Sequence, residues 1–300
     1  MALDLMRKAK ARNTIRSYRA DWCAFESWCI EHDRSSLPAS PDTLVLYLTD
    51  AVRAGLKVST LQRRQSAISQ AHQAAGLETP TAAYMVRTLM AGIRRERGTA
   101  PGYKTAAVTE ILRAMVAGLT DKPIGCRDRA LLLLGFSGAF RRSELVSLDI
   151  PDLEFAKDGF TVTLRRSKTD QEQAGRRIGI PYGSNLLTCP VRAMEVWLSQ
   201  VGMSGPLFRA VNRGGRISDL RLCDKAVALI IKRRAVAAGL NPANYAGHSL
   251  RSGLATSAAA AGVSERAIMA QTGHTSLTIV RRYIREGSLF RENAAAAVGL

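Results

Sequence analysis

One break in the chain, Gly98-Thr-Ala-Pro-Gly102, separates two kinds of residue pattern and constrains the fold most strongly. Up to residue 97 every apolar pattern has helical spacing. Beyond the break, helical stretches are interrupted by 159–164 and 177–180, where apolar and polar residues alternate as in strands. Glycine and proline at the break favour a linker. We therefore predict an all-helical domain at 1–98, a linker at 99–105, and a mainly α domain with a small β-sheet at 106–300.

The N-terminal part is expected to contain four helices. Ile15, Tyr18 and Trp22 begin one apolar face, and Ser40 followed by Pro41 is typical of a helix start. The four helices are predicted at about 14–31, from Ser40 to Gly55, from Ser59 onward, and from about Thr81 to Arg97.

The C-terminal part is expected to be mostly helical. Its helices are predicted near 109–118, 126–136, 190–201, 219–238 and 249–261, with two short ones at 264–271 and 276–286 and an alanine-rich one from about 289.

The charge of the chain favours a polyanionic partner. There are 43 Lys and Arg against 25 Asp and Glu, a formal charge of +18. Both parts are basic, with 15 basic and 9 acidic residues up to Gly98 and 28 and 16 after it. Basic surfaces bind nucleic acids because counterions leave the phosphates. A basic protein without a nucleic-acid partner is the alternative that charge alone leaves open.

Other sequence features limit the class further. No apolar run approaches the ~20 residues of a membrane span, and the start lacks a signal-peptide pattern. The five cysteines contain no C-x-x-C pair, so we expect them to be buried, unpaired residues of a cytoplasmic protein. With four histidines, no H-E-x-x-H and no G-x-x-x-x-G-K motif, neither a metal nor a nucleotide cofactor is expected.

Four spaced motifs suggest the chemistry. They are Gly138-Ala-Phe-Arg141-Arg-Ser-Glu144-Leu145, Lys168 in the turn between the two predicted strands, His248-Ser-Leu-Arg251, and Gly273-His274 with Tyr283 nine residues further on. In this order they closely resemble the tyrosine recombinase (phage integrase) family. Similar stretches at 55–61, 90–97 and 261–269 extend the resemblance over essentially the whole chain.

The resemblance implies a role for each residue. The family's arginine precedes the glutamate by three residues, which selects Arg141 over Arg142. Paired guanidinium groups suit a phosphate clamp because they donate bidentate hydrogen bonds. The implied site comprises Arg141 and Arg251 as the clamp, Tyr283 as nucleophile, His248 as general base, Lys168 as general acid, His274 as a phosphate ligand in place of the tryptophan of some members, and Glu144 as an orienting group.

The family also implies an architecture. A SAM-like core-binding domain and a catalytic domain are expected to form a C-shaped clamp on double-stranded DNA. The reaction passes through a 3′-phosphotyrosine and a Holliday junction, needs no cofactor, and takes place in a homotetramer on two sites. The apolar stripe within 288–300 is expected to dock into a neighbouring protomer, although folding back onto its own domain is the alternative.

Basic residues outside the site are candidates for DNA contacts. Lys225 lies where one family member places a guanine-reading arginine, whereas Arg233 and Arg234 are expected to meet phosphates. The full set is Arg63, Arg64, Arg94, Arg95, Lys225, Lys232, Arg233, Arg234 and Arg282.

Two other functions remain open at this point. Residues 264–283 resemble a helix-turn-helix, which would suit a DNA-binding regulator without catalysis. A type IB topoisomerase would share the active-site chemistry. Each residue also has a structural explanation on its own, such as a solvated turn lysine at 168 or a half-buried tyrosine at 283. Only the combination of motifs in one basic chain favours the recombinase.

Overall fold

A computed structural model describes residues 12–99, 104–165 and 175–287. The chain forms two compact units, Met1–Gly102 and Tyr103–Leu300, each of which is described by itself. Among the described residues, none of the helices combines the length and apolarity that crossing a membrane requires. Lys168, Arg166 and the predicted C-terminal helix lie outside the described residues.

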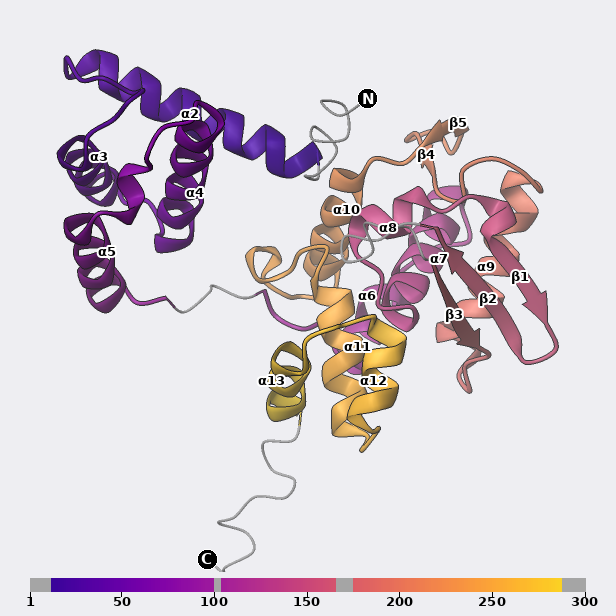
Figure 1. Cartoon of the computed structure of the whole chain (residues 1–300). Helices are drawn as coiled ribbons and strands as arrows, with labels where there is room; N and C mark the ends of the chain where they lie inside the picture. The colour runs from indigo at the N-terminus through magenta and orange to yellow at the C-terminus, as the bar shows by residue number, and fades with distance from the viewer. Residues whose placement is uncertain (1–11, 100–103, 166–174, 288–300) are drawn as a thin grey trace, which may run out of the picture. The chain divides into compact units, whose positions relative to one another are not determined.

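The N-terminal unit is a helical bundle (Figure 1). Phe25, Leu44, Leu48, Leu61 and Ile68, all fully buried, belong to its core. The elements are α2 (Arg12–Glu31), α3 (Pro41–Arg53), α4 (Val58–Ala74), the 3-10 helix η1 (Pro80–Ala82) and α5 (Tyr84–Arg97).

One helix start in this unit follows local capping chemistry. The predicted cap of α3 is confirmed, because Ser40 Oγ accepts from the Thr43 backbone N–H at 3.1 Å. Two other starts were misplaced. Helix α4 begins at Val58 rather than Ser59, and the stretch near Thr81 is a separate 3-10 turn that precedes α5.

The C-terminal unit is mainly helical, as predicted. Its α-helices are α6 (Thr109–Ala117), α7 (Pro123–Ser137), α8 (Arg142–Ser147), α9 (Pro190–Val201), α10 (Asp224–Ala237), α11 (Ser249–Ala260), α12 (Glu265–Thr272) and α13 (Leu277–Gly287). Short 3-10 turns are η2 (Ile150–Asp152), η3 (Leu186–Thr188) and η4 (Pro242–Asn244).

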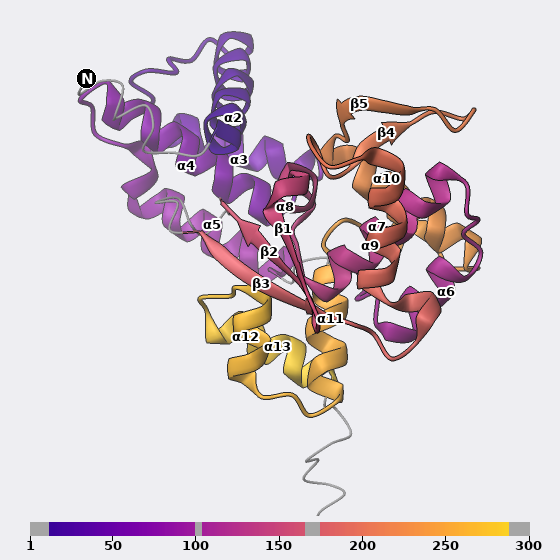
Figure 2. The ribbon, with the colours of Figure 1, turned by 90° about the vertical axis from the view of Figure 1, so that its right-hand side faces the viewer.

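Two small antiparallel sheets accompany these helices (Figure 2). In the first, β2 (Gly159–Leu164) lies between β1 (Leu153–Ala156) and β3 (Arg176–Pro181), with Val162 opposite Ile178. The second pairs β4 (Arg209–Val211) with β5 (Ile217–Arg221).

The sequence analysis missed three of these strands and helix α8, and it placed the start of α7 at 126 rather than Pro123. The helix predicted from 219 begins only at Asp224, because residues 217–221 pair with β4. A neighbouring strand that supplies backbone hydrogen-bond partners outweighs a local helical pattern. Strand β1 escaped prediction because most of its side chains are exposed and leave no clear alternation.

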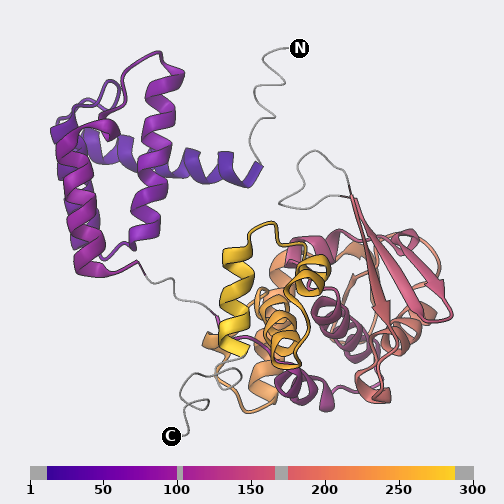
Figure 3. The ribbon, with the colours of Figure 1, turned by 60° about the horizontal axis from the view of Figure 1, so that its bottom comes forward.

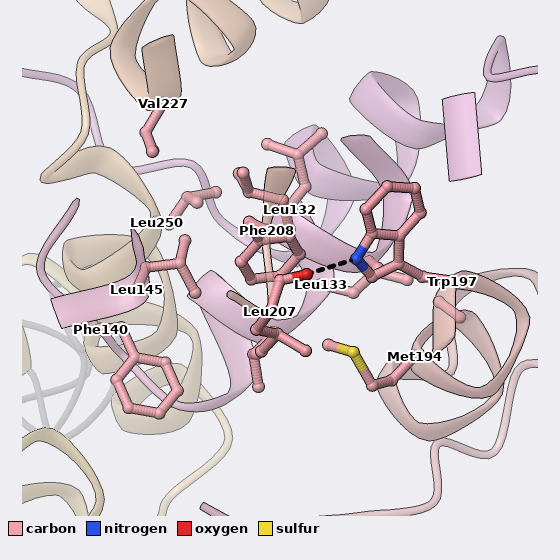
Figure 4. Packing of buried hydrophobic residues seen from close by; sticks show 14 of the residues in the cluster. Leu132, Leu133, Phe140, Leu145, Met194, Trp197, Leu207, Phe208, Val227 and Leu250 are labelled. Carbon is pink, nitrogen blue, oxygen red and sulfur yellow. Dashed lines mark hydrogen bonds between the residues drawn. The ribbon is translucent and has the colours of Figure 1, made fainter. Parts of the chain in front are cut away.

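The core of the C-terminal unit surrounds α7, which is buried on nearly every side (Figure 4). Trp197 of α9 is fully buried and donates from Nε1 to the Leu207 carbonyl at 2.7 Å, so its polar atom is satisfied. Helix α11 packs closely on α7, since a Cβ added at Gly135 would lie 2.8 Å from the Leu250 side chain. This packing fixes α11 relative to the end of α7.

The last three described helices lie side by side (Figure 3), and a smaller apolar cluster joins them. Ala255 and Ala259 of α11 meet Ile268 of α12 and Val280 and Tyr283 of α13. Small side chains on α11 allow this close approach. The expectation that all cysteines are buried was wrong at two positions, since Cys23 and Cys223 are exposed; all five are free thiols.

Candidate active site

Arg141 is held at the start of α8 by Glu144. One carboxylate oxygen of Glu144 accepts from the Arg141 backbone N–H at 2.8 Å, and the other accepts from its Nη1 at 2.5 Å. The Glu144 side chain is only 3% exposed. A buried carboxylate with two charge-assisted bonds holds the arginine in one orientation. The spacing of three residues follows from this geometry at the first turn of a helix.

The turn before Arg141 requires small residues. A Cβ at Gly138 would overlap the ring of Phe140, which is itself buried. The next residue, Ala139, has a left-handed backbone with φ of 49°, a conformation that is unfavourable for a residue with a Cβ. This turn directs the Ala139 carbonyl toward α11.

Arg251 is fully buried and incompletely paired. Its Nη1 donates to the Ala139 carbonyl at 2.7 Å. Its Nε and Nη2 have no hydrogen-bond acceptor among the described residues. Burial, assisted by the nearby Arg141 charge, lowers the pKa of Arg251 from 12.5 to about 10. Buried donors without acceptors are costly, so this guanidinium has two donors that an anion could satisfy.

His248 and Tyr283 meet beside this guanidinium. The Nε2 atom of His248 lies 3.2 Å from the hydroxyl oxygen of Tyr283. Tyr283 is 5% exposed, and its ring belongs to the small cluster between α11 and α13. His248 precedes the first residue of α11, and Arg251 follows on the next turn. The spacing of three residues therefore brings both side chains to one place, as predicted from the sequence.

His274 completes the group from the turn after α12. Its Nδ1 lies 2.8 Å from the Thr272 hydroxyl oxygen, and that hydroxyl donates to the Ile268 carbonyl at 2.7 Å. The Thr272 oxygen is therefore left to accept a hydrogen bond from Nδ1–H, and we assign the Nδ1–H tautomer on this basis. Burial lowers the pKa of His274 to about 3, and the charges of Arg251 and Arg141 add to the effect. The ring is neutral at pH 7.

Neighbouring basic residues have other partners. Arg142 pairs with Asp224 of α10 at 3.2 Å, so Arg141 rather than Arg142 faces Glu144. Arg165 pairs with Asp152 at 2.6 Å. The assignment of Lys168 falls outside the described residues and stays a prediction.

The structure separates the DNA-contact candidates into two groups. Arg63 donates two bonds to the buried Asp21 at 2.7 and 3.0 Å, Arg64 donates to the Tyr47 hydroxyl at 2.7 Å, and Arg234 donates to the Met115 carbonyl at 2.9 Å. These three arginines hold helices together. Arg282 lies over the Tyr283 ring, 5.4 Å from its centroid. The exposed candidates are Arg94, Arg95, Lys225, Lys232 and Arg233, and also Arg63, whose side chain is 48% exposed despite its bonds to Asp21.

The sequence analysis missed two residues close to the site. Thr272 gave no signal because a buried threonine in a short helix is common. Arg176, at the start of β3, donates from Nη1 to the carbonyls of Ala270 and Gln271 at 3.3 and 3.2 Å. Only the tertiary fold brings this strand to α12.

This arrangement defines a class of site. Buried and half-buried cations surround a tyrosine hydroxyl that is hydrogen-bonded to a histidine. Such a site suits attack of the hydroxyl on a phosphodiester, since guanidinium groups stabilise the charge that develops on the phosphate oxygens. Among the described residues there is no group of three or more His, Cys, Asp or Glu side chains placed to hold a metal ion.

The comparisons with known proteins agree with this class. The Phage integrase family matches residues 105–288, and the Phage integrase N-terminal SAM-like domain matches residues 3–78. The chain therefore belongs to the phage integrase family and is a tyrosine-type site-specific recombinase that cleaves and rejoins DNA. The predicted fold class is confirmed, and the alternative of a regulator without catalysis is set aside.

Two relatives cover most of the chain. An "Integrase/recombinase xerD homolog" of Selenomonas ruminantium is 43% identical over 295 residues, which is 96% of this chain and 86% of the relative. "Recombinase cre" of Escherichia phage P1 is 27% identical over 300 residues, 93% of this chain and 85% of the relative.

Solved structures share the fold. A lambda integrase dimer bound to a core site has a TM-score of 0.64 at 16% identity, covering 94% of this chain and 74% of that one. A post-cleavage complex of the XerH site-specific recombinase with a difH substrate has a TM-score of 0.61 at 17% identity, covering 87% and 71%. At these identities the likeness concerns the fold alone.

Proposed function

We propose that Tyr283 is the nucleophile and that it acts on the phosphate held by the same chain. Its hydroxyl oxygen attacks the phosphorus and its proton passes to His248, which lies 3.2 Å away. The bond from phosphorus to the 5′-oxygen breaks, and Lys168 supplies the proton of the leaving 5′-hydroxyl. The products are a 3′-phosphotyrosine and a free 5′-hydroxyl.

Rejoining is the same reaction in reverse on a partner strand. A 5′-hydroxyl attacks the phosphotyrosine, the new phosphodiester forms, and Tyr283 regains its proton. The number of phosphoester bonds is unchanged, so no nucleotide cofactor is required. Two such rounds through a Holliday junction exchange both strands of two duplexes.

The observation that carries this proposal is the incomplete pairing of Arg251. Its Nε and Nη2 are buried beside the Tyr283 hydroxyl and Arg141, without acceptors among the described residues. The nonbridging oxygens of a phosphate supply acceptors for both donors, and a guanidinium binds them in bidentate fashion. Arg141, fixed by Glu144, provides the second half of the clamp.

The protonation state of His274 determines whether it can donate a hydrogen bond to the phosphate. In the Nδ1–H tautomer its Nε2 is an acceptor and donates nothing to a phosphate. Burial and the arginine charges lower the His274 pKa in the free protein. The negative charge of a bound phosphate raises it and therefore favours the protonated ring. We infer that His274 takes up a proton from solvent at Nε2 when the phosphate binds, and that the resulting N–H donates a hydrogen bond to the phosphate.

The partner is proposed to be double-stranded DNA with specific sites. The other exposed candidates, Arg63, Arg94, Arg95, Lys232 and Arg233, are proposed to meet phosphates, whereas Lys225, at the second position of α10, reads a base. Lys225→Ala should weaken binding by about 1–3 kcal/mol at one base pair. Arg233→Ala, nine residues from the start of the same helix, serves as the matched control and should weaken all sequences equally. Selection of binding sites from a random library distinguishes the two.

Assembly is proposed to be a tetramer on two DNA sites. The lambda integrase neighbour is described as a dimer bound to a core site, and strand exchange between two such dimers requires four protomers. Analytical ultracentrifugation with two-site DNA tests this, and the truncation of residues 288–300 tests the predicted docking segment. A truncated protein that still forms tetramers and recombines would show that this segment is dispensable.

A covalent adduct tests the proposed chemistry directly. Protein incubated with DNA from its own genomic context and boiled in detergent should retain DNA on Tyr283, and sequencing that DNA should give the target site. Tyr283→Phe should bind the same DNA and form no adduct, because only the nucleophilic oxygen is lost. An adduct at the wild-type level from this variant would refute the assignment. Relaxation of every supercoiled plasmid regardless of sequence would instead indicate a topoisomerase.

A further inference from the structure

Arg176 lies at the beginning of β3 and contacts the end of α12. Its Nη1 donates to the carbonyl oxygens of Ala270 and Gln271 at 3.3 and 3.2 Å. The last carbonyls of a helix have no partner within the helix, and a cation there also interacts favourably with the helix dipole. Arg176 therefore closes the end of the helix that leads into the Gly273-His274 turn.

The room for this guanidinium comes from Gly273. Its backbone is left-handed, with φ of 65° and ψ of 38°, as is usual for the residue that ends a helix. A Cβ at this position would overlap Nη1 of Arg176 and lie 2.7 Å from its Cζ. Glycine is thus favoured here by the backbone conformation, and any larger residue would also displace the Arg176 guanidinium.

A second connection ties the same helix end to the same strand. Gln271 donates from Nε2 to the Ser137 carbonyl at 2.7 Å and to the Gly179 carbonyl at 3.2 Å. Gly179 belongs to β3, and Ser137 is the last residue of α7. The end of α12 is therefore fastened to β3 at two points, Arg176 and Gly179, and to the helix that precedes the Arg141 turn.

The position of His274 depends on this helix end. Its Nδ1 is bonded to Thr272, the last residue of α12, and its ring centroid lies 5.8 Å from that of Tyr283. Arg176 also belongs electrostatically to the site. Burial lowers the pKa of Arg176, Glu144 raises it and Arg141 lowers it further.

From this geometry we propose that Arg176 is a positioning residue of the recombinase: by closing the end of α12 it fixes His274 relative to Tyr283 and the phosphate. Arg176 itself does not touch the reacting atoms in this proposal. The proposal rests on the function proposed for His274.

The next residue provides a matched control. Arg177 carries the same charge on the same strand, but it pairs with Glu154 of β1 at 2.8 Å and its side chain is 66% exposed. Successive residues of a strand point to opposite faces. Arg177→Met therefore makes the same chemical change without reaching α12.

The first measurement is the single-turnover cleavage rate on a nicked duplex carrying the site recovered from the covalent adduct. Arg176→Met should slow cleavage about tenfold or more at unchanged DNA affinity, because small displacements of a catalytic group are costly. Arg177→Met should cleave within about twofold of wild type. Arg176→Lys should recover most of the rate, since an ammonium can donate to both carbonyls. Should Arg176→Met fail to fold, Arg176→Gln takes its place.

The second measurement asks whether Arg176 acts through His274. In a His274→Gln background, Arg176→Met should cause little further loss. Imidazole NMR provides a readout independent of activity, because the chain has only four histidines. Arg176→Met should move the His274 signal and raise its pKa, whereas Arg177→Met should leave both unchanged.

The outcomes are distinguishable. Any of three results would overturn the proposal for Arg176. Arg176→Met could cleave at the wild-type rate, the rate losses of Arg176→Met and His274→Gln could multiply in the double variant, or the His274 NMR signal could stay unmoved in Arg176→Met. Wild-type cleavage by His274→Gln alone would instead contradict the function proposed for His274. In that case the NMR comparison in the free protein still decides whether Arg176 holds the turn.

Discussion

Replacing Arg251 by methionine should stabilise the free protein while abolishing cleavage. The fall of the Arg251 pKa from 12.5 to about 10 corresponds to about 3 kcal/mol against the charged form in the folded state. The variant loses the bond to the Ala139 carbonyl, which is worth about 2 kcal/mol for a charged donor. A methionine reaches about as far as Nε of the arginine and keeps the apolar packing of the aliphatic part of the side chain. The free energy of unfolding should therefore rise by about 1 kcal/mol.

A second buried arginine supplies the control. Arg127 is 3% exposed and donates to Asp128 at 2.9 and 2.6 Å. Arg127→Met leaves that carboxylate buried and unpaired, which should destabilise the protein by about 3–5 kcal/mol. The two variants thus make the same substitution at buried sites, and they should change stability in opposite directions.

Urea unfolding followed by circular dichroism measures both variants without DNA, and adduct formation measures cleavage. We expect Arg251→Met to lose at least ~10²-fold in cleavage rate, the scale for one preorganised transition-state donor. A loss of stability equal to that of Arg127→Met would refute the argument. It would mean that Arg251 is satisfied in the folded protein and is not held ready for an anion.

Four further expectations follow from the site. Arg141→Ala should slow cleavage by at least ~10²-fold, while Arg142→Ala should have a small effect. Cleavage rates of the two variants within threefold of each other would contradict the assignment of Arg141 to the phosphate clamp. Cleavage should persist in excess EDTA because arginines neutralise the phosphate, and a requirement for restored Mg²⁺ would contradict this. DNA affinity should fall by orders of magnitude between about 50 and 200 mM salt if 6–10 phosphates are contacted, so a flat titration would argue against it. The His274 pKa is depressed to about 3, so between about pH 6.5 and 3 this histidine is protonated in the unfolded state and neutral in the folded state. The free energy of unfolding should therefore fall as the pH drops through this range. In acid titrations, His274→Gln should reduce the slope of that fall.

Much of this protein could be predicted from its sequence because the relevant signals are local. A glycine, an arginine and a glutamate at fixed spacing specify the turn at Gly138 and the carboxylate that holds Arg141. His248 and Arg251 lie on one helix face because helical geometry alone brings residues three apart together. The cap of α3 at Ser40 was equally local. Helix patterns and charge thus gave the fold class and the polyanionic partner.

Other features were decided only by tertiary structure, because they join segments that are distant in sequence. Strand β5 replaced a predicted helical turn once β4 supplied its backbone partners. The sequence predicts a DNA contact for Arg63, and only the folded domain shows that Asp21, forty-two residues earlier, also binds it. The sequence does not distinguish Arg176 from Arg177, yet Arg176 contacts α12 and Arg177 pairs with a residue of β1. Contacts such as these depend on which helix and strand faces the core brings together, and a local sequence pattern does not contain that information.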